Sequence, residues 1–138
     1  MNSSQNFDFP KNSLIITTSG AKSRGWIDYL KIKNFTLFDS VEPNPSMETI
    51  DNILSEFDQN FSSIIGLGGG SSLDVAKFVA NKLKKTKILI PTTFGSGSEV
   101  TRISVLKVDG KKTSFHSDDL LADIAIIDPY FIKDAPME

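Results

Sequence analysis

Four glycines lie close together near the middle of the chain, in residues 66–72, with a spacing suited to phosphate binding. They follow the apolar pair Ile64-Ile65 and precede a stretch with helical spacing, so a strand is predicted to turn into a helix here. Backbone without Cβ atoms approaches a ligand closely, and the amides of a first helical turn attract an anion. A pyrophosphate is the expected ligand, with Ser71 as a hydroxyl donor and Asp74 inside the first turn. The alternative is that the glycines only make a tight turn and Asp74 only caps the helix.

A second polar segment, residues 91–101, sets hydroxyl side chains around two glycines, directly after the apolar run 88–90. Hydroxyl groups are compact donors that line a phosphate or ribose groove without adding net charge. The hydroxyl residues of interest include Thr92, Thr93, Ser96 and Ser98. A flexible loop rich in serine and glycine explains the same composition equally well.

The usual dinucleotide fingerprint is only half present. Gly66 and Gly68 fit it, but Ser71 stands where the third glycine belongs, and no acidic residue follows at the usual distance. Instead, Asp39 ends an earlier apolar run, residues 35–38. A carboxylate there would accept hydrogen bonds from the adenosine ribose and repel a 2′-phosphate, which favours NAD over NADP. An aspartate after a strand is also a common turn former.

Strands alternating with helices are predicted around both glycine segments. Apolar runs at residues 14–18, 35–38, 64–65 and 88–90 read as strands, and residues 72–83 have helical spacing. Another helix is predicted to begin just after Pro45, with Ser46 as its N-cap. This alternation predicts an α/β fold, a Rossmann-like parallel sheet flanked by helices on both faces.

The last third of the chain has a different pattern of predicted elements. Residues 100–108 and 113–115 flank Asp109-Gly110, which predicts a β-hairpin near the C-terminus. A final apolar run, residues 124–127, ends at Asp128-Pro129. The residues after it are expected to begin a further element.

Composition excludes several classes of function. The length of 138 residues fits one domain, and 15 basic against 17 acidic residues, with no basic cluster, argue against nucleic-acid binding. No apolar run is long enough to span a membrane, and no secretory signal is visible. The absence of cysteine removes disulfides and thiolate metal sites and fits a cytoplasmic location. A single histidine, His116, rules out a centre of several histidines within this chain and is expected to be a surface residue.

Four landmarks in order carry a family resemblance. The two longer ones are Gly68-Gly69-Gly70-Ser71-Ser72-Leu73-Asp74-Val75-Ala76-Lys77 and Ile90-Pro91-Thr92-Thr93-Phe94-Gly95-Ser96-Gly97-Ser98-Glu99-Val100-Thr101. The shorter ones are Asp39 before Val41-Glu42-Pro43-Asn44-Pro45, and Ala125-Ile126-Ile127-Asp128-Pro129. Together they resemble the iron-containing (group III) alcohol dehydrogenases over about residues 14–128. Ala122, where family members commonly have proline, and a short stretch at 80–88 depart from the family pattern.

The resemblance implies that residues 1–138 are the N-terminal dinucleotide-binding domain of such an enzyme. Asp39 would meet the adenosine ribose, and Lys112, otherwise a solvated hairpin lysine, would reach the cofactor. The residues implied around the pyrophosphate and the neighbouring ribose are Gly69, Gly70, Ser71 and Asp74, with Thr92, Thr93, Ser96 and Ser98 completing the groove.

The resemblance also implies what this chain does not supply. In the family, an all-helical second domain holds Fe²⁺, or sometimes Zn²⁺, with ligands that would lie beyond Glu138, so no catalytic or metal residue is expected here. The complete enzyme would transfer hydride between a nicotinamide cofactor and a small alcohol or its aldehyde or ketone, and the chain alone would be inactive.

Two other functions stay open. The chain is also consistent with a non-catalytic nucleotide-binding module or a subunit of a split enzyme. It is also consistent with a sugar-phosphate site or a relative of glycerol dehydrogenase and dehydroquinate synthase. Without the rest of the family interface, an exposed apolar face near residues 126–131 and a homo-oligomer are expected.

Overall fold

The computed structural model of the chain describes residues 7–57, 60–93 and 101–132. Its centre is a five-stranded parallel sheet in the order β2-β1-β3-β4-β7. The strands are β1 (Ser13–Ile16), β2 (Phe35–Phe38), β3 (Ser63–Gly68), β4 (Thr86–Pro91) and β7 (Ile124–Ala125). The predicted parallel sheet is therefore confirmed, although β1 ends at Ile16 and β7 is only two residues long.

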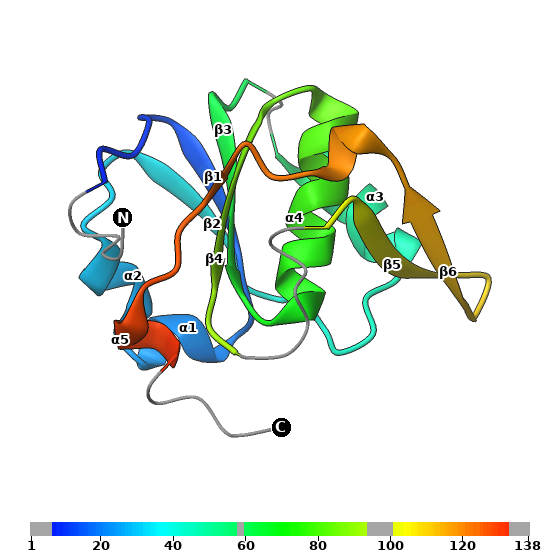
Figure 1. The fold of residues 1–138 in the computed structure, drawn as a ribbon, viewed down its shortest axis with the longest axis horizontal. Helices are drawn as coiled ribbons and strands as arrows, with labels where there is room; N and C mark the ends of the chain where they lie inside the picture. Colours follow the sequence, from blue (N-terminus) through cyan, green and yellow to red (C-terminus); the bar gives the residue numbers. More distant parts are fainter. Residues whose placement is uncertain (1–6, 58–59, 94–100, 133–138) are drawn as a thin grey trace.

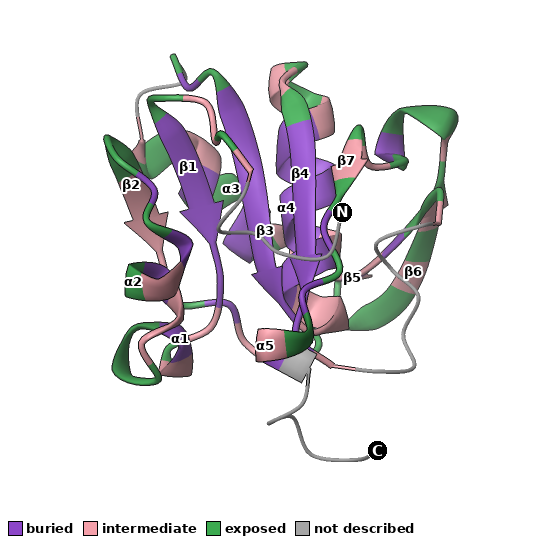
Figure 2. Ribbon diagram, turned by 60° about the vertical axis from the view of Figure 1, so that its left-hand side comes forward, coloured by how far each residue is buried: buried purple, intermediate pink, exposed green. Residues whose placement is uncertain are grey.

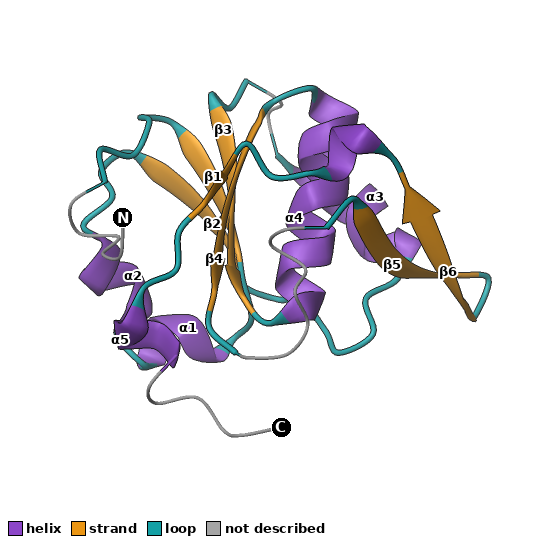
Figure 3. Cartoon of the chain, in the orientation of Figure 1, coloured by secondary structure: helices purple, strands orange, loops and turns teal. Residues whose placement is uncertain are grey.

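Helices cover both faces of the sheet (Figures 1 and 3). The short helices α1 (Gly20–Ser23), α2 (Trp26–Leu30) and α5 (Pro129–Ile132) lie on one face, and α3 (Met47–Glu56) and α4 (Gly70–Leu83) lie on the other. Ser46 caps α3 as predicted, because its hydroxyl accepts from the Thr49 amide at 3.4 Å. Among the described residues, no helix has the length and apolar character needed to cross a membrane.

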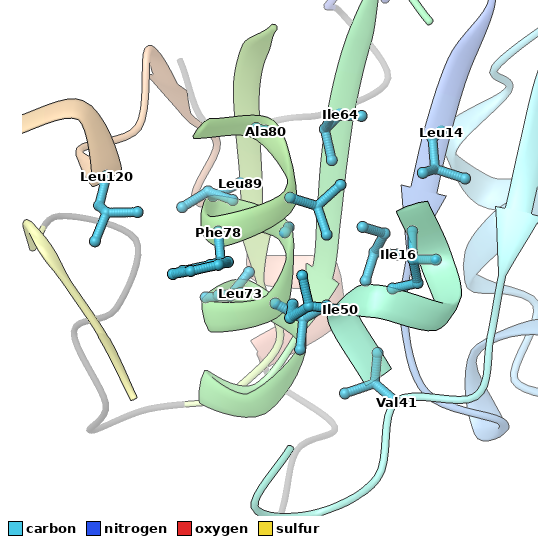
Figure 4. Close-up of a cluster of buried hydrophobic side chains, with 14 of the residues drawn as sticks. Leu14, Ile16, Val41, Ile50, Ile64, Leu73, Phe78, Ala80, Leu89 and Leu120 are labelled. Carbon is cyan, nitrogen blue, oxygen red and sulfur yellow. The ribbon is translucent and has the colours of Figure 1, made fainter. Parts of the chain in front are cut away.

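The central strands are buried on both faces, as Figure 2 shows for β1, β3 and β4. Leu14, Ile64 and Leu89 pack against α3 and α4 in the cluster drawn in Figure 4. The alternate residues Ile15 and Ile65 pack against α1, α2 and α5. This two-sided burial explains why the strands read as continuous apolar runs rather than as alternating ones.

Gly66 belongs to β3 and not to the turn after it. A Cβ at this position would lie 2.7 Å from the Cβ of Ala76 and 3.0 Å from Cδ2 of Leu89. The strand therefore needs glycine here so that α4 can pack directly on the sheet. The contact places α4, and with it the turn at its N-terminus, close to β3.

A two-stranded antiparallel hairpin packs beside α4 (Figure 1). It consists of β5 (Ile103–Val108) and β6 (Lys111–His116), and the 3-10 helix η3 (Asp118–Leu120) follows. Asp109 and Gly110 make the turn with φ values of 52° and 81°, which is the geometry that a two-residue hairpin favours. The predicted hairpin is confirmed, with β5 beginning at Ile103 rather than at residue 100.

The predicted apolar face at residues 126–131 is wrong. Ile126 is 3% exposed and Phe131 is fully buried, because the chain after β7, including α5, packs on the α2 side of the sheet. Ile127 alone among the large aliphatic residues of this segment is exposed, at 43%. The burial of these residues therefore removes the reason to expect self-association through this surface. The homo-oligomer stays a prediction that this surface does not support.

Candidate functional site

The order of the strands places a topological switch point between the ends of β1 and β3. The chain leaves β1 toward α1 on one face of the sheet and leaves β3 toward α4 on the opposite face. At such a switch point, the two connections diverge and leave a groove in which open α/β sheets bind ligands. The glycine turn after β3 therefore lies at the edge of the sheet where open α/β folds bind ligands.

Thr17, directly after β1, joins the two predicted parts of the site. Its hydroxyl donates to the carbonyl oxygen of Leu67 at 2.6 Å, next to the glycine turn. The backbone amide of Thr17 donates to the carbonyl oxygen of Phe38 at 2.9 Å, and the carbonyl oxygen of Thr17 accepts from the amide of Val41 at 3.2 Å. Asp39 lies between Phe38 and Val41, so it is held at the same edge of the sheet, partly buried.

The connection from β3 to α4 requires glycine at Gly68, the last residue of the strand. Gly68 has φ of +146°, and a Cβ there would lie 2.9 Å from the hydroxyl of Ser72. Gly69 is the extended N-cap of α4, and a Cβ on it would lie 3.3 Å from Oγ1 of Thr93. The glycines therefore let the turn close onto its own chain, while the first amides of α4 keep no partner within the helix.

The hydroxyl of Ser72 is buried and has no hydrogen-bond partner among the described residues. It lies in the first turn of α4, beside Gly68. A buried polar group without a partner is costly, so such a group at a helix N-terminus is suited to an added acceptor. The donors at this turn, backbone amides and hydroxyls, fit the oxygens of a phosphate.

A pocket of about 290 Å³ separates the N-terminus of α4 from the hairpin. It brings together four predicted residues, Gly70, Ser71, Asp74 and Lys112. Lys107, which the sequence analysis did not single out, also lines it. Lys107 stands directly opposite Lys112 in the hairpin. The sequence contains a signal for this pairing, because a two-residue turn at Asp109-Gly110 pairs Val108 with Lys111 and therefore Lys107 with Lys112.

Asp74 does not have the position predicted for it. It lies in the second turn of α4 and does not cap the helix, whose N-cap is Gly69. Its Oδ2 accepts from the backbone amide of Val105 at 3.3 Å, and its Oδ1 lies 3.9 Å from Nζ of Lys77. The carboxylate that lines the pocket is therefore also bonded to the first half of β5.

The remaining predicted residues divide into three groups. Thr92 is buried after β4, and its amide donates to the carbonyl of Gly68 at 3.0 Å, while Thr93 lies against Gly69. These two residues are thus at the glycine turn. Ser96 and Ser98 lie outside the described residues. Asp39 is at the same edge of the sheet but does not line the 290 Å³ pocket.

His116 lies away from this site. It is exposed at the end of β6 and lines a separate pocket of about 690 Å³ with Ile103, Leu121 and the exposed ion pair between Arg102 and Asp118. Across the described ranges, no three His, Cys, Asp or Glu side chains are grouped so that they could hold a metal ion.

Comparison with known proteins identifies the fold and the family. The family model for iron-containing alcohol dehydrogenase matches residues 3–129. Long-chain-alcohol dehydrogenase 1 of Geobacillus thermodenitrificans is 36% identical over 154 aligned residues, which cover 91% of this chain and 39% of that protein.

Two solved structures have the same fold. An iron-containing alcohol dehydrogenase from Thermococcus thioreducens superposes with a TM-score of 0.82 at 25% identity, covering 91% of this chain and 42% of that one. A sulfoacetaldehyde reductase from Bifidobacterium kashiwanohense, solved in complex with NAD⁺, superposes with a TM-score of 0.82 at 28% identity, covering 91% of this chain and 40% of that one. The chain thus spans about two fifths of the length of these relatives. It belongs to the family of iron-containing alcohol dehydrogenases.

Proposed function

We propose that this chain is the dinucleotide-binding domain of a dehydrogenase that transfers hydride between NAD(H) and an alcohol or its carbonyl product. The observation that carries the proposal is the turn from Gly68 into α4, at the switch point of the sheet, facing a pocket with Lys107 and Lys112. The turn supplies amide donors and a positive helix end, and the lysines supply charge. The NAD⁺ complex of the sulfoacetaldehyde reductase supports a nicotinamide dinucleotide as the ligand.

Each part of the site has a proposed role in holding the cofactor. The amides at Gly69 and Gly70 and the hydroxyl of Ser71 bind the pyrophosphate, with Thr92 and Thr93 at the far side of the turn. Lys112 reaches the pyrophosphate or the adjoining ribose from the hairpin. Asp39 accepts from the hydroxyls of the adenosine ribose, which favours NAD. Ser96 and Ser98 are proposed to complete the groove.

The bound nicotinamide supplies the hydride chemistry, and this chain orients it. Because the chain matches the family model for iron-containing alcohol dehydrogenase, we propose that a divalent metal, Fe²⁺ or Zn²⁺, would supply a Lewis acid for the substrate oxygen in the complete enzyme, with ligands outside residues 1–138. The protein residues described here then act by binding, and the substrate contacts lie elsewhere. The chain by itself is accordingly proposed to bind NADH without oxidising alcohols.

Titration of the 138-residue chain with NADH, followed by nucleotide fluorescence, tests this function. Saturable binding is expected, together with no NADH production from NAD⁺ and an alcohol. Gly70→Asp should weaken binding about tenfold or more, because it adds a negative charge at the pyrophosphate. The substitution should leave the fold intact, since an acidic residue is favourable in the first turn of a helix.

Asn52→Asp is the matched control, because it adds the same charge at an exposed position of α3 that does not line the pocket. It should bind NADH like the parent chain. Absence of NADH binding by the folded parent, or equal affinities for the parent and Gly70→Asp, would reject the proposed cofactor site.

A further inference from the structure

Lys77 is a wholly buried cation on α4, and binding of the cofactor does not account for it. Its side chain has no exposed surface, whereas the remaining lysines of this helix and its C-terminal end, Lys82 and Lys84, are exposed. Burying an ammonium group is costly unless the group is paired and hydrogen-bonded. The contacts that offset this cost show which part of the molecule depends on Lys77.

Two hydrogen bonds of Lys77 lead to the start of the hairpin, and its ion pair with Asp74 lies within α4. Nζ of Lys77 donates to Oγ1 of Thr101 at 3.1 Å and to the carbonyl oxygen of Ile103. One turn earlier, Asp74 accepts from the amide of Val105 through its carboxylate, and its carbonyl oxygen accepts from Oγ of Ser104 at 2.9 Å. A single turn of α4 thus holds residues 101–105 by side-chain hydrogen bonds.

The same hairpin carries Lys112 to the cofactor pocket. The register is continuous, with Val105 opposite Ser114 and Lys107 opposite Lys112, so a shift of β5 would move Lys112 with it. Gly70 and Ser71, at the N-terminus of α4, form the opposite wall of the pocket. The distance between the lysine and the glycine turn therefore depends on how β5 is fixed to α4.

We infer that Lys77 is a positioning residue for the cofactor site: its buried ammonium fixes the β5–β6 hairpin on α4 and so sets Lys112 over the glycine turn. The inference rests on the proposed binding of a nicotinamide dinucleotide. Lys77 does not line the pocket itself and acts through the hairpin and through Asp74, which lines the pocket and whose Oδ1 lies 3.9 Å from its Nζ.

The hairpin has other attachments that keep the chain folded when Lys77 is replaced. Phe115 of β6 packs edge-on against Phe78 of α4, with ring centroids 5.1 Å apart. Leu106 is buried in the core, and the amide of Lys107 donates to the carbonyl of Pro45 at 2.8 Å. Loss of the ammonium should therefore loosen the position of β5 without detaching the hairpin.

A double-mutant cycle on NADH affinity tests the inference, with Lys77→Met, Lys112→Met and the double variant. Lys112→Met should weaken binding about tenfold, the effect of losing one charge-assisted hydrogen bond. Lys77→Met should weaken it roughly fivefold in the parent chain and have almost no effect in the Lys112→Met chain, because the two residues act in series. Lys84→Met, an exposed lysine at the C-terminal end of the same helix, is the matched control and should bind like the parent.

Thr101→Val provides a second route if Lys77→Met lowers the yield of folded protein. It removes one acceptor of the ammonium while keeping the volume, and it should weaken NADH binding roughly twofold to threefold, again only when Lys112 is present. Two results would overturn the inference and leave the proposed function standing. One is that the effects of Lys77→Met and Lys112→Met on NADH affinity add. The other is that folded Lys77→Met and Thr101→Val bind NADH as tightly as the parent chain. Failure of the parent chain to bind NADH would overturn both.

Discussion

The hairpin and the carboxyl edge of the parallel sheet carry charges of opposite sign. Lys107 and Lys112 lie opposite each other on the hairpin, and like charges in directly opposed strand positions are unfavourable unless an anion lies between them. Asp39, after β2, places an acceptor at the other part of the edge. A dinucleotide needs this arrangement, since its phosphates require positive charge and its ribose hydroxyls require acceptors.

Asp39→Gly should change the preference between the two nicotinamide cofactors. The carboxylate is proposed to repel the 2′-phosphate of NADPH, so its removal should raise the affinity for NADPH relative to NADH roughly tenfold. Parallel titrations with NADH and NADPH measure the ratio. Asp8→Gly, at an exposed position before β1, is the control and should keep the parent ratio. An unchanged ratio in Asp39→Gly would show that this carboxylate does not contact the ribose.

At the scale of elements, the contact between β3 and α4 determines where the glycine turn lies. Gly66→Ala should lower the free energy of unfolding by about 1–3 kcal/mol, because the added methyl group would press on Ala76 and Leu89 in a packed core. Urea unfolding followed by circular dichroism measures the loss.

A compensating change separates crowding from other effects of Gly66→Ala. Ala76→Gly removes the Cβ that would be crowded, so in that background the cost of Gly66→Ala should fall clearly below its cost in the parent chain. Equal costs in the two backgrounds would mean that the strand-to-helix contact does not require glycine at this position.

The elements that the sequence predicted well are those with strong local signals. β2 coincides with the apolar run 35–38, and α3 begins after Ser46, because a strand-length apolar run and an N-cap are both encoded within a few residues. The hairpin follows from Asp109-Gly110, whose positive φ values suit these residue types.

The features that the sequence did not predict depend on contacts between distant residues. α1 and α2, of four and five residues, are too short to show a helical period. Gly66 looked like part of the turn, because only the packing of α4 shows that it belongs to β3. The bond between Asp74 and Val105 joins residues 31 positions apart, so spacing within the glycine motif could not reveal it.

At the scale of the whole molecule, the last described residues are tied back to the first third of the chain. The hydroxyl of Tyr29 donates to Oδ2 of Asp128 at 3.1 Å, and the ring of Tyr29 stacks on Tyr130 with centroids 3.7 Å apart. Trp26 meets Phe131 edge-on at 5.8 Å. The chain therefore closes around the sheet at α5 instead of leaving an apolar face there.

Phe131→Ala tests whether this closure stabilises the domain. Phe131 is fully buried among aromatic rings and core aliphatic residues, so its truncation should cost about 3–5 kcal/mol of unfolding free energy in urea. Ile127→Ala, four residues earlier and 43% exposed, should change it by less than about 1 kcal/mol. Equal losses in the two variants would contradict the docking of α5. The expected difference would show that the segment after β7 is part of the folded core, so any chain that continues beyond it would start from a fixed position.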